Sequence, residues 1–257
     1  MLNQTKISPE AEKVIEDYLN LPFPNIDGVR CPYFNNARLG QRGQLKVLVG
    51  KGTPQEIVEE AKIIAIQYKQ EISKAGLTAE HIRKFLIDHN LGVDCSGFIS
   101  NVLIAHLATR GSHLTKKMFI TPKANVLRWL ISHLRPVEQM NVKVYADNKN
   151  TEKIDDLSKI EAGDLVVMLS TGPKKNHDHI LLITETQDNV LHYAHARTWS
   201  SEGRYGHGVS TGTITLNNPN KGLVDQTWEE KDELNQNNET YWEARDATVL
   251  EIRRLKF

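Results

Sequence analysis

The sequence lacks several features that mark common classes of protein. Its 32 basic and 32 acidic side chains cancel, so nothing in the composition indicates binding to nucleic acid or to an anionic membrane surface. Two cysteines, Cys31 and Cys95, are too few for the disulfide framework of a small secreted scaffold, and we expect two free thiols. No apolar run approaches the length of a membrane span, and residues 1–21 lack a signal-peptide pattern. The sequence therefore favours a cytoplasmic protein, with secretion left open.

Helical patterns fill the first half of the chain and short strand patterns the second. Ser8, Thr53 and Thr78 each precede apolar residues at helical spacing, which is typical of N-caps. The segment 95–107 is apolar on nearly every side and predicts a buried central helix. Helices followed by an antiparallel sheet define an α+β fold. The other expected elements are a helix over 122–134, a loop over 229–240, and strands over 45–49, 142–145, 164–169, 180–185, 190–194, 212–216 and 248–253.

Cys95 follows a glycine-containing turn and begins the predicted central helix. Backbone donors and the positive end of the helix dipole favour a thiolate there, and an imidazolium close by would lower the thiol pKa, as attack on an amide carbonyl requires. The backbone N–H of Cys95 would supply one oxyanion donor. Asp94 either caps the helix or positions a loop, and Ser96 and Gly97 would allow close approach of substrate or of the histidine strand. An ordinary buried cysteine is the alternative.

Two histidines compete for the role of general base. His177 and His179 point to the same side of an extended chain, but His179 directly precedes the apolar strand predicted over 180–185. His179 is therefore the better anchored and is the predicted base. We expect His177 in the preceding loop, as a rim residue that touches substrate or as a solvated side chain.

The group that orients the base should come from the next strand of the hairpin. A two-residue turn at Asp188 and Asn189 would place His195 opposite Leu182, close to the predicted base. His192 and His195 are three positions apart and face opposite sides of their strand, so at most one joins the site easily. We favour His195.

Four short motifs occur in order between about residues 90 and 200: Asp94-Cys95-Ser96-Gly97-Phe98, Gly163-Asp164-Leu165-Val166, His179-Ile180-Leu181-Leu182-Ile183 and His195-Ala196-Arg197. They resemble the nucleophile motif, the strand before the histidine, the histidine strand and the third polar position of the NlpC-type cell-wall cysteine peptidases. The resemblance implies a papain-like fold, Cys95 as nucleophile, His179 as base, His195 as orienter and no cofactor. The family also has an aromatic residue in the pocket, a position for which Tyr33 is the candidate.

The resemblance also implies a substrate class, a peptide amide such as the peptidoglycan stem linkage between D-Glu and a diamino acid. Residues 1–90 would form a helical extension packed on a catalytic core of residues 91–257. Three alternatives stay open: an intracellular thiol amidase or acyltransferase, a non-catalytic module on the same fold, and a zinc site. The zinc site would use His177, Asp178, His179, His192, His195 and Cys95, although no metal-binding spacing motif accompanies them.

Overall fold

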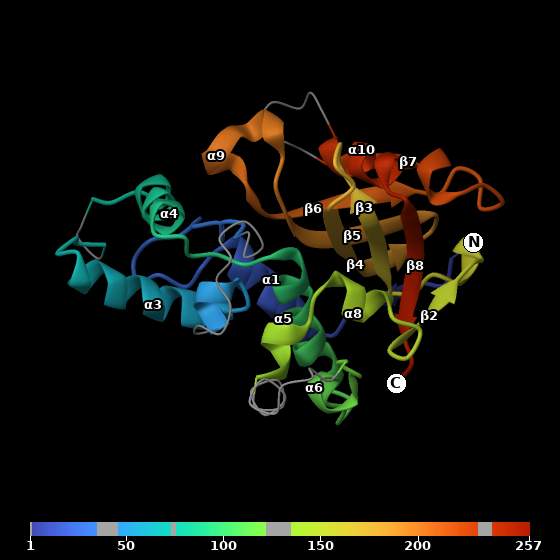
Figure 1. Ribbon diagram of the computed structural model, residues 1–257, viewed down its shortest axis with the longest axis horizontal. Helices are drawn as coiled ribbons and strands as arrows, with labels where there is room; N and C mark the ends of the chain where they lie inside the picture. The colour runs from blue at the N-terminus through green and yellow to red at the C-terminus, as the bar shows by residue number, and fades with distance from the viewer. Residues whose placement is uncertain (1, 35–45, 73–75, 122–134, 231–237) are drawn as a thin grey trace.

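The computed structural model describes residues 2–34, 46–72, 76–121, 135–230 and 238–257 (Figure 1). These residues form an α+β fold with eight α-helices and one open antiparallel sheet of eight strands, which confirms the predicted fold class. The helices are α1 Pro9–Leu19, α3 Pro54–Gln67, α4 Ala79–Asp88, α5 Cys95–Ala108, α6 Leu114–Lys117, α8 Val142–Ala146, α9 Gly203–Gly206 and α10 Glu239–Asp246. The strands are β1 Thr5–Lys6, β2 Thr151–Ile154, β3 Leu165–Thr171, β4 His177–Gln187, β5 Val190–Arg197, β6 Gly208–Thr215, β7 Thr227–Glu230 and β8 Val249–Leu255.

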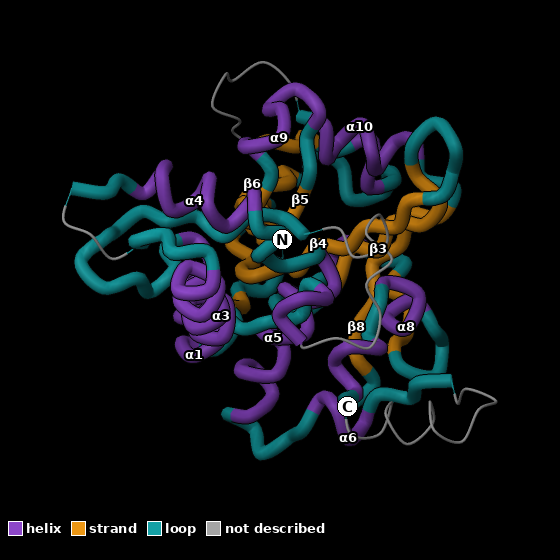
Figure 2. The backbone as a smooth tube through the Cα atoms, turned by 60° about the vertical axis from the view of Figure 1, so that its left-hand side comes forward, coloured by secondary structure: helices purple, strands orange, loops and turns teal. Residues whose placement is uncertain are grey.

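The sheet runs in the order β2-β8-β3-β4-β5-β6-β7, and β1 pairs with β4. Helix α5 packs against β4 and β5 on one side and α1 on the other, so it lies at the centre of the molecule (Figures 1 and 2). Its apolar cluster includes Tyr18 from α1, Phe98 from α5 and Leu182 from β4. A second cluster on the opposite sheet face joins Tyr193 and Trp228, beneath α10. The N-terminal residues thus share the main core, whereas the boundary at residue 90 stays a prediction.

The predicted helix starts are confirmed. Thr53 accepts a hydrogen bond from the Glu56 backbone at 3.3 Å, and the Glu56 carboxylate accepts one from the Thr53 backbone at 2.7 Å. Such reciprocal capping satisfies two orphan backbone donors. Ser8 and Thr78 cap α1 and α4 in the same manner, through the backbone N–H three residues on. No helix in the described part of the chain has the length and apolarity that crossing a membrane requires.

Several predicted elements differ in the structure. Residues 142–145 are not a strand but lie in helix α8, capped by the Asn141 side chain, with Val142 and Tyr145 buried at a helical spacing of three. Lys46–Val49 is a short 3-10 helix and not a strand. The predicted loop over 229–240 begins inside β7 and ends inside α10. The helix predicted over 122–134 lies outside the described residues.

The β4–β5 hairpin turns at Asp188 and Asn189 as predicted, but its register does not follow the simple count. A bulge between Ile183 and Glu185 shifts the pairing, so that Leu182 lies opposite Ala194. The prediction that His195 lies opposite Leu182 is therefore wrong by one residue. A bulge adds one unpaired residue to a strand and leaves no clear mark in an apolar pattern.

Candidate active site

Cys95 is the first residue of α5, and Asp94 is its N-cap. The Asp94 carboxylate accepts a hydrogen bond from the Gly97 backbone at 2.6 Å, which confirms the capping role and orders the first turn. Only 5% of Cys95 is exposed. The candidate nucleophile is thus held at the start of a buried helix, with little open surface around it.

Lys51 is a buried partner of this turn that the sequence did not reveal. Its ammonium donates to Asp94 Oδ1 at 2.8 Å, to Ser96 Oγ at 2.6 Å and to the Met140 carbonyl at 2.8 Å. All three ammonium hydrogens are therefore used. Ser96 is occupied by this network, because its hydroxyl also donates to Asp94 at 3.0 Å. A single lysine between two glycines carries no sequence signal for such a contact.

Gly97 permits a close approach, but of a different segment than expected. A Cβ at this position would lie 2.2 Å from the Gly50 carbonyl oxygen and close to Lys51. The glycine therefore lets the Gly50–Lys51 segment lie against the first turn of α5. The nearest atoms to such a Cβ all belong to Gly50 and Lys51.

The thiol pKa of Cys95 moves in the direction opposite to the prediction. Burial, reinforced by the Asp94 charge, raises it to about 12, while the Lys51 ammonium lowers it by a smaller amount. The helix dipole is worth well under 2 kcal/mol at such a site, and the loss of hydration outweighs it. Cys95 is consequently a neutral thiol in the resting protein, and the expectation of a stabilised thiolate is wrong.

Tyr33 lies beside Cys95, as the resemblance suggested. Tyr33 pairs with Val93 in a parallel β-bridge, and the Tyr33 backbone N–H donates to the His207 carbonyl at 3.3 Å. Burial raises the pKa of the Tyr33 hydroxyl well above its ordinary value, and the adjacent Cys95 thiol adds to the effect. The Tyr33 segment thereby joins the turn before α5 to the start of β6, where Gly208 pairs with Arg197 at the end of β5.

His179 and His195 form a direct pair. His179 Nε2 and His195 Nδ1 are 2.7 Å apart, and both residues are buried. Burial lowers the pKa of His179 well below its ordinary value, so its imidazole is neutral at neutral pH. Of the two β5 histidines, His195 is the one that contacts His179, whereas His192 is half-buried and pairs with Glu185 across the hairpin.

The thiol and the histidine pair approach from opposite sides of the sheet. By strand alternation His179 shares its face of β4 with Leu181, whereas α5 packs on the face that carries Leu182. Among the residues that the structure describes, no hydrogen bond joins Cys95 to His179. Cys95 is the first residue of its helix, and His179 is the third residue of its strand.

His177 is the first residue of β4 and not part of the preceding loop. It is exposed and pairs with Thr171 beyond an irregularity in the β3–β4 ladder. This position is compatible with the predicted rim location. Among the described residues, no three His, Cys, Asp or Glu side chains are grouped as a metal site requires.

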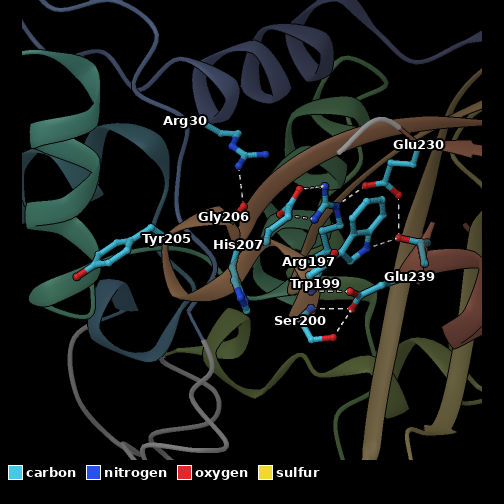
Figure 3. Close-up of polar contacts among 12 residues, drawn as sticks. Arg30, Arg197, Trp199, Ser200, Tyr205, Gly206, His207, Glu230 and Glu239 are labelled. Carbon is cyan, nitrogen blue, oxygen red and sulfur yellow. Dashed lines mark hydrogen bonds and ion pairs between the residues drawn. The ribbon is translucent and has the colours of Figure 1, made fainter. Parts of the chain in front are cut away.

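Behind the histidine pair lies a buried polar network that the sequence analysis missed. His195 Nε2 is 3.1 Å from the carboxylate of Glu230, which also binds Arg197. Arg197 makes a bidentate ion pair with Glu202 at 2.8 and 2.9 Å and stacks on Trp199, 3.5 Å from the ring centroid. Figure 3 shows the Arg197 guanidinium beside the Trp199 indole, facing Glu230. The site thus extends from the histidines into the core beneath α10.

Glu243 of α10 links the two halves of the site electrostatically. Its carboxylate accepts a hydrogen bond from Thr171 at 2.7 Å, next to the start of β4. Burial raises the pKa of Glu243 to about 7, with the Glu230 charge adding to the effect. The Glu243 charge in turn raises the pKa of Cys95. Glu243 is therefore within electrostatic range of both the thiol and the histidine network.

Replacing Glu243 by Gln should stabilise the protein only at high pH. The folded-state pKa of about 7 lies above the ordinary 4.5, so ionisation of this buried carboxyl opposes folding, fully above pH 7 and not at all below about pH 4.5. We expect Glu243→Gln to exceed the wild type by about 1 kcal/mol or more in free energy of unfolding near pH 8. Urea denaturation near pH 8 and below about pH 4.5 measures the free energy of unfolding of both proteins. The exposed Glu229→Gln control should show no such difference, and equal stability of Glu243→Gln and wild type near pH 8 would contradict the buried charge.

No protein-family model matches the chain, and a comparison with curated proteins finds no match. The likeness to the NlpC-type peptidases therefore depends on the short motifs around Cys95, His179 and His195 alone.

Proposed function

We propose that the protein is a papain-like cysteine hydrolase that cleaves an amide bond, with Cys95 as nucleophile, His179 as general base and His195 as the group that orients the base. The observation that carries the proposal is the 2.7 Å contact between His179 Nε2 and His195 Nδ1. This contact uses Nε2 of His179, so a proton taken from the thiol would have to go to Nδ1. It lies at the end of the sheet that the Tyr33 segment ties to the turn before Cys95.

The proposed reaction starts from a neutral pair. Because the thiol pKa of Cys95 is about 12 and the pKa of His179 is well below its ordinary value, a preformed thiolate–imidazolium pair is disfavoured. The Cys95 S–H proton moves to His179 Nδ1 as the sulfur–carbon bond forms and the carbonyl electron pair moves to oxygen. The Cys95 backbone N–H, which lies at the helix start, stabilises that oxyanion. The imidazolium then returns its proton to the departing amine, which leaves a thioester on Cys95.

The substrate we propose is a peptide amide, with the peptidoglycan stem linkage between D-Glu and a diamino acid as the leading example. The motif resemblance alone supports this class, and fold-level likeness is a weak guide to substrate. If the protein is cytoplasmic, its substrate would be a wall fragment undergoing recycling or another intracellular amide. Water completes a hydrolysis, whereas an amine or alcohol acceptor would make the same thioester serve an acyltransferase.

The test measures how fast iodoacetamide alkylates Cys95, read by peptide mass spectrometry across the pH range. A thiol of pKa about 12 holds roughly 10³-fold less thiolate at neutral pH than an ordinary thiol of pKa ~8.5. Assistance by His179 should make the wild type react faster than this fraction allows. We expect His179→Ala to slow alkylation by about 10²-fold, the size of a typical general-base contribution.

Two controls make this result interpretable. Cys31 has no exposed surface, so its labelling reports unfolding. His113 is exposed and makes no capping hydrogen bond, and His113→Ala should leave the rate of Cys95 alkylation unchanged. Equal alkylation rates in wild type and His179→Ala would rule out the Cys95–His179 pair and favour a non-catalytic module. A slowed variant would justify screening peptide amides for hydrolysis.

A further inference from the structure

Glu230, the last residue of β7, is a carboxylate whose side chain has no exposed surface. Among the described residues, four side chains lie within hydrogen-bond distance of it. Tyr193 donates to Oε2 at 2.9 Å, Thr240 donates to Oε2 at 2.8 Å, and Arg197 donates to Oε1. His195 Nε2 lies 3.1 Å from Oε1 and 3.2 Å from Oε2. Within the described part of the chain, each side chain that contacts this buried carboxylate can donate a hydrogen bond.

The protonation of His195 follows from these partners. Burial alone would raise the pKa of Glu230, but His195 and Arg197 together lower it below its ordinary value, so the group is ionised at neutral pH. An ionised carboxylate only accepts hydrogen bonds. His195 Nε2, which lies within hydrogen-bond distance of both carboxylate oxygens, must then carry its hydrogen. If the ring carries only this one hydrogen, Nδ1 is left as an acceptor.

The position of the hydrogen on His179 follows in the same way. His195 Nδ1 faces His179 Nε2 at 2.7 Å, and since Nδ1 accepts, His179 Nε2 must donate. The hydrogen of neutral His179 is thereby assigned to Nε2, and the lone pair lies on Nδ1. A single buried carboxylate thus sets the tautomer of two successive imidazoles.

We propose that Glu230 is a positioning residue that fixes the tautomers of His195 and His179, so that His179 presents its Nδ1 lone pair as the base. Its catalytic consequence rests on the proposed function, because only a base facing Cys95 makes the Nδ1 lone pair useful. Glu230 touches neither the thiol nor the substrate and acts through His195. It also replaces the direct carboxylate orienter of a Ser-His-Asp triad with a carboxylate one ring further away.

The charges around Glu230 match this role. Arg197 is shared between Glu230 and Glu202, so the guanidinium does not serve Glu230 alone. The three groups together carry one net negative charge beside His195. That charge stabilises the imidazolium that forms on His179 when it takes the Cys95 proton, as the Glu230 contribution to raising the pKa of His179 indicates. A carboxylate needed only for packing would require no unbalanced charge.

Histidine ¹⁵N NMR of the wild type at neutral pH tests the assignment directly, because protonated and unprotonated ring nitrogens resonate apart. We expect hydrogen on Nε2 and none on Nδ1 in both His195 and His179. Hydrogen on Nδ1 of His195 in the folded wild type would overturn the proposal. This measurement needs no variant, so it decides the question even if a substitution of Glu230 fails to fold.

The variant Glu230→Gln then tests whether the charge is the cause. The amide can donate as well as accept, so His195 is free to present either nitrogen, and we expect the Nδ1–H tautomers of both histidines to appear. Tyr193→Phe is the matched control, because it removes one neutral hydrogen bond from the same carboxylate and should leave the tautomers unchanged. Wild-type tautomers in folded Glu230→Gln would refute the role of the charge.

Alkylation of Cys95 separates this proposal from the proposed function. If both hold, Glu230→Gln should slow alkylation about tenfold and Tyr193→Phe should not. If His179→Ala leaves alkylation unchanged while Glu230→Gln still shifts the tautomers, the Cys95–His179 pair fails and the positioning of the histidines stands. If His179→Ala slows alkylation but Glu230→Gln affects neither the tautomers nor the rate, the Cys95–His179 pair stands and the positioning role of Glu230 fails.

Discussion

Replacing Lys51 by Met should destabilise the protein by about 3–5 kcal/mol, the usual cost of removing one partner of a buried ion pair. The Lys51 side chain is 4% exposed and that of its partner Asp94 is 15% exposed. Methionine has a similar length but cannot donate, so the variant leaves the Asp94 charge without its ion-pair partner and the Met140 carbonyl without the hydrogen bond from Lys51. Chemical denaturation followed by circular dichroism measures the loss in free energy of unfolding.

The uncompensated charge, and not the lost packing, should account for most of this loss. Asn keeps the N-capping ability of Asp94 without its charge, so the double variant Lys51→Met with Asp94→Asn should be more stable than Lys51→Met alone. A double variant no more stable than the single one would contradict this reasoning. Lys13→Met is the matched control, because Lys13 is exposed and water screens its helical ion pair with Asp17, so the loss should be much smaller.

The sequence was sufficient for most of the fold because its signals there are local. Thr53 and Glu56 identify a helix start through hydrogen bonds that span three residues, and the Asp188-Asn189 turn fixes a hairpin in the same local manner. The failures are cases in which local signals conflict. Residues 142–145 include two valines and a tyrosine, which favour a strand, yet the Asn141 cap and the i, i+3 burial of Val142 and Tyr145 make them helical.

The candidate site was predictable only where residues adjacent in sequence act together. Cys95, Asp94 and His179 stand in recognisable local patterns, and the pairing of His195 with His179 depends on a single hairpin. Lys51 and Glu230 reach the site from 44 and 35 positions away from Cys95 and His195, differences read directly from the numbering. The effect of burial on the pKa of Cys95 could not be predicted from the sequence either, because the desolvation that raises it depends on the assembled core. The approach of Lys51 and Glu230 to the site and the pKa of Cys95 therefore depend on tertiary placement and not on residue type.

Replacing Arg197 by Met should also cost about 3–5 kcal/mol in free energy of unfolding, for a related reason. The Arg197 side chain is 2% exposed and forms ion pairs with both Glu230 and Glu202, whose side chains are 0% and 5% exposed. Methionine fills similar space, but it leaves two buried carboxylates without their cation and also removes the stacking on Trp199, worth about 1–2 kcal/mol when desolvated. Thermal and urea unfolding measure the combined loss.

The variant Arg204→Met separates burial from the mere presence of an ion pair. Arg204 has the same two kinds of contact, an ion pair with Asp88 at 3.0 Å and a cation–π contact with Tyr205, but its side chain is 63% exposed. Water screens such contacts, so Arg204→Met should cost less than about 1 kcal/mol. Similar losses in the two variants would show that desolvation does not strengthen the Arg197 network. A large loss only for Arg197→Met would show that the buried charges behind the histidines, where Glu230 lies, contribute most of the site's share of the free energy of unfolding.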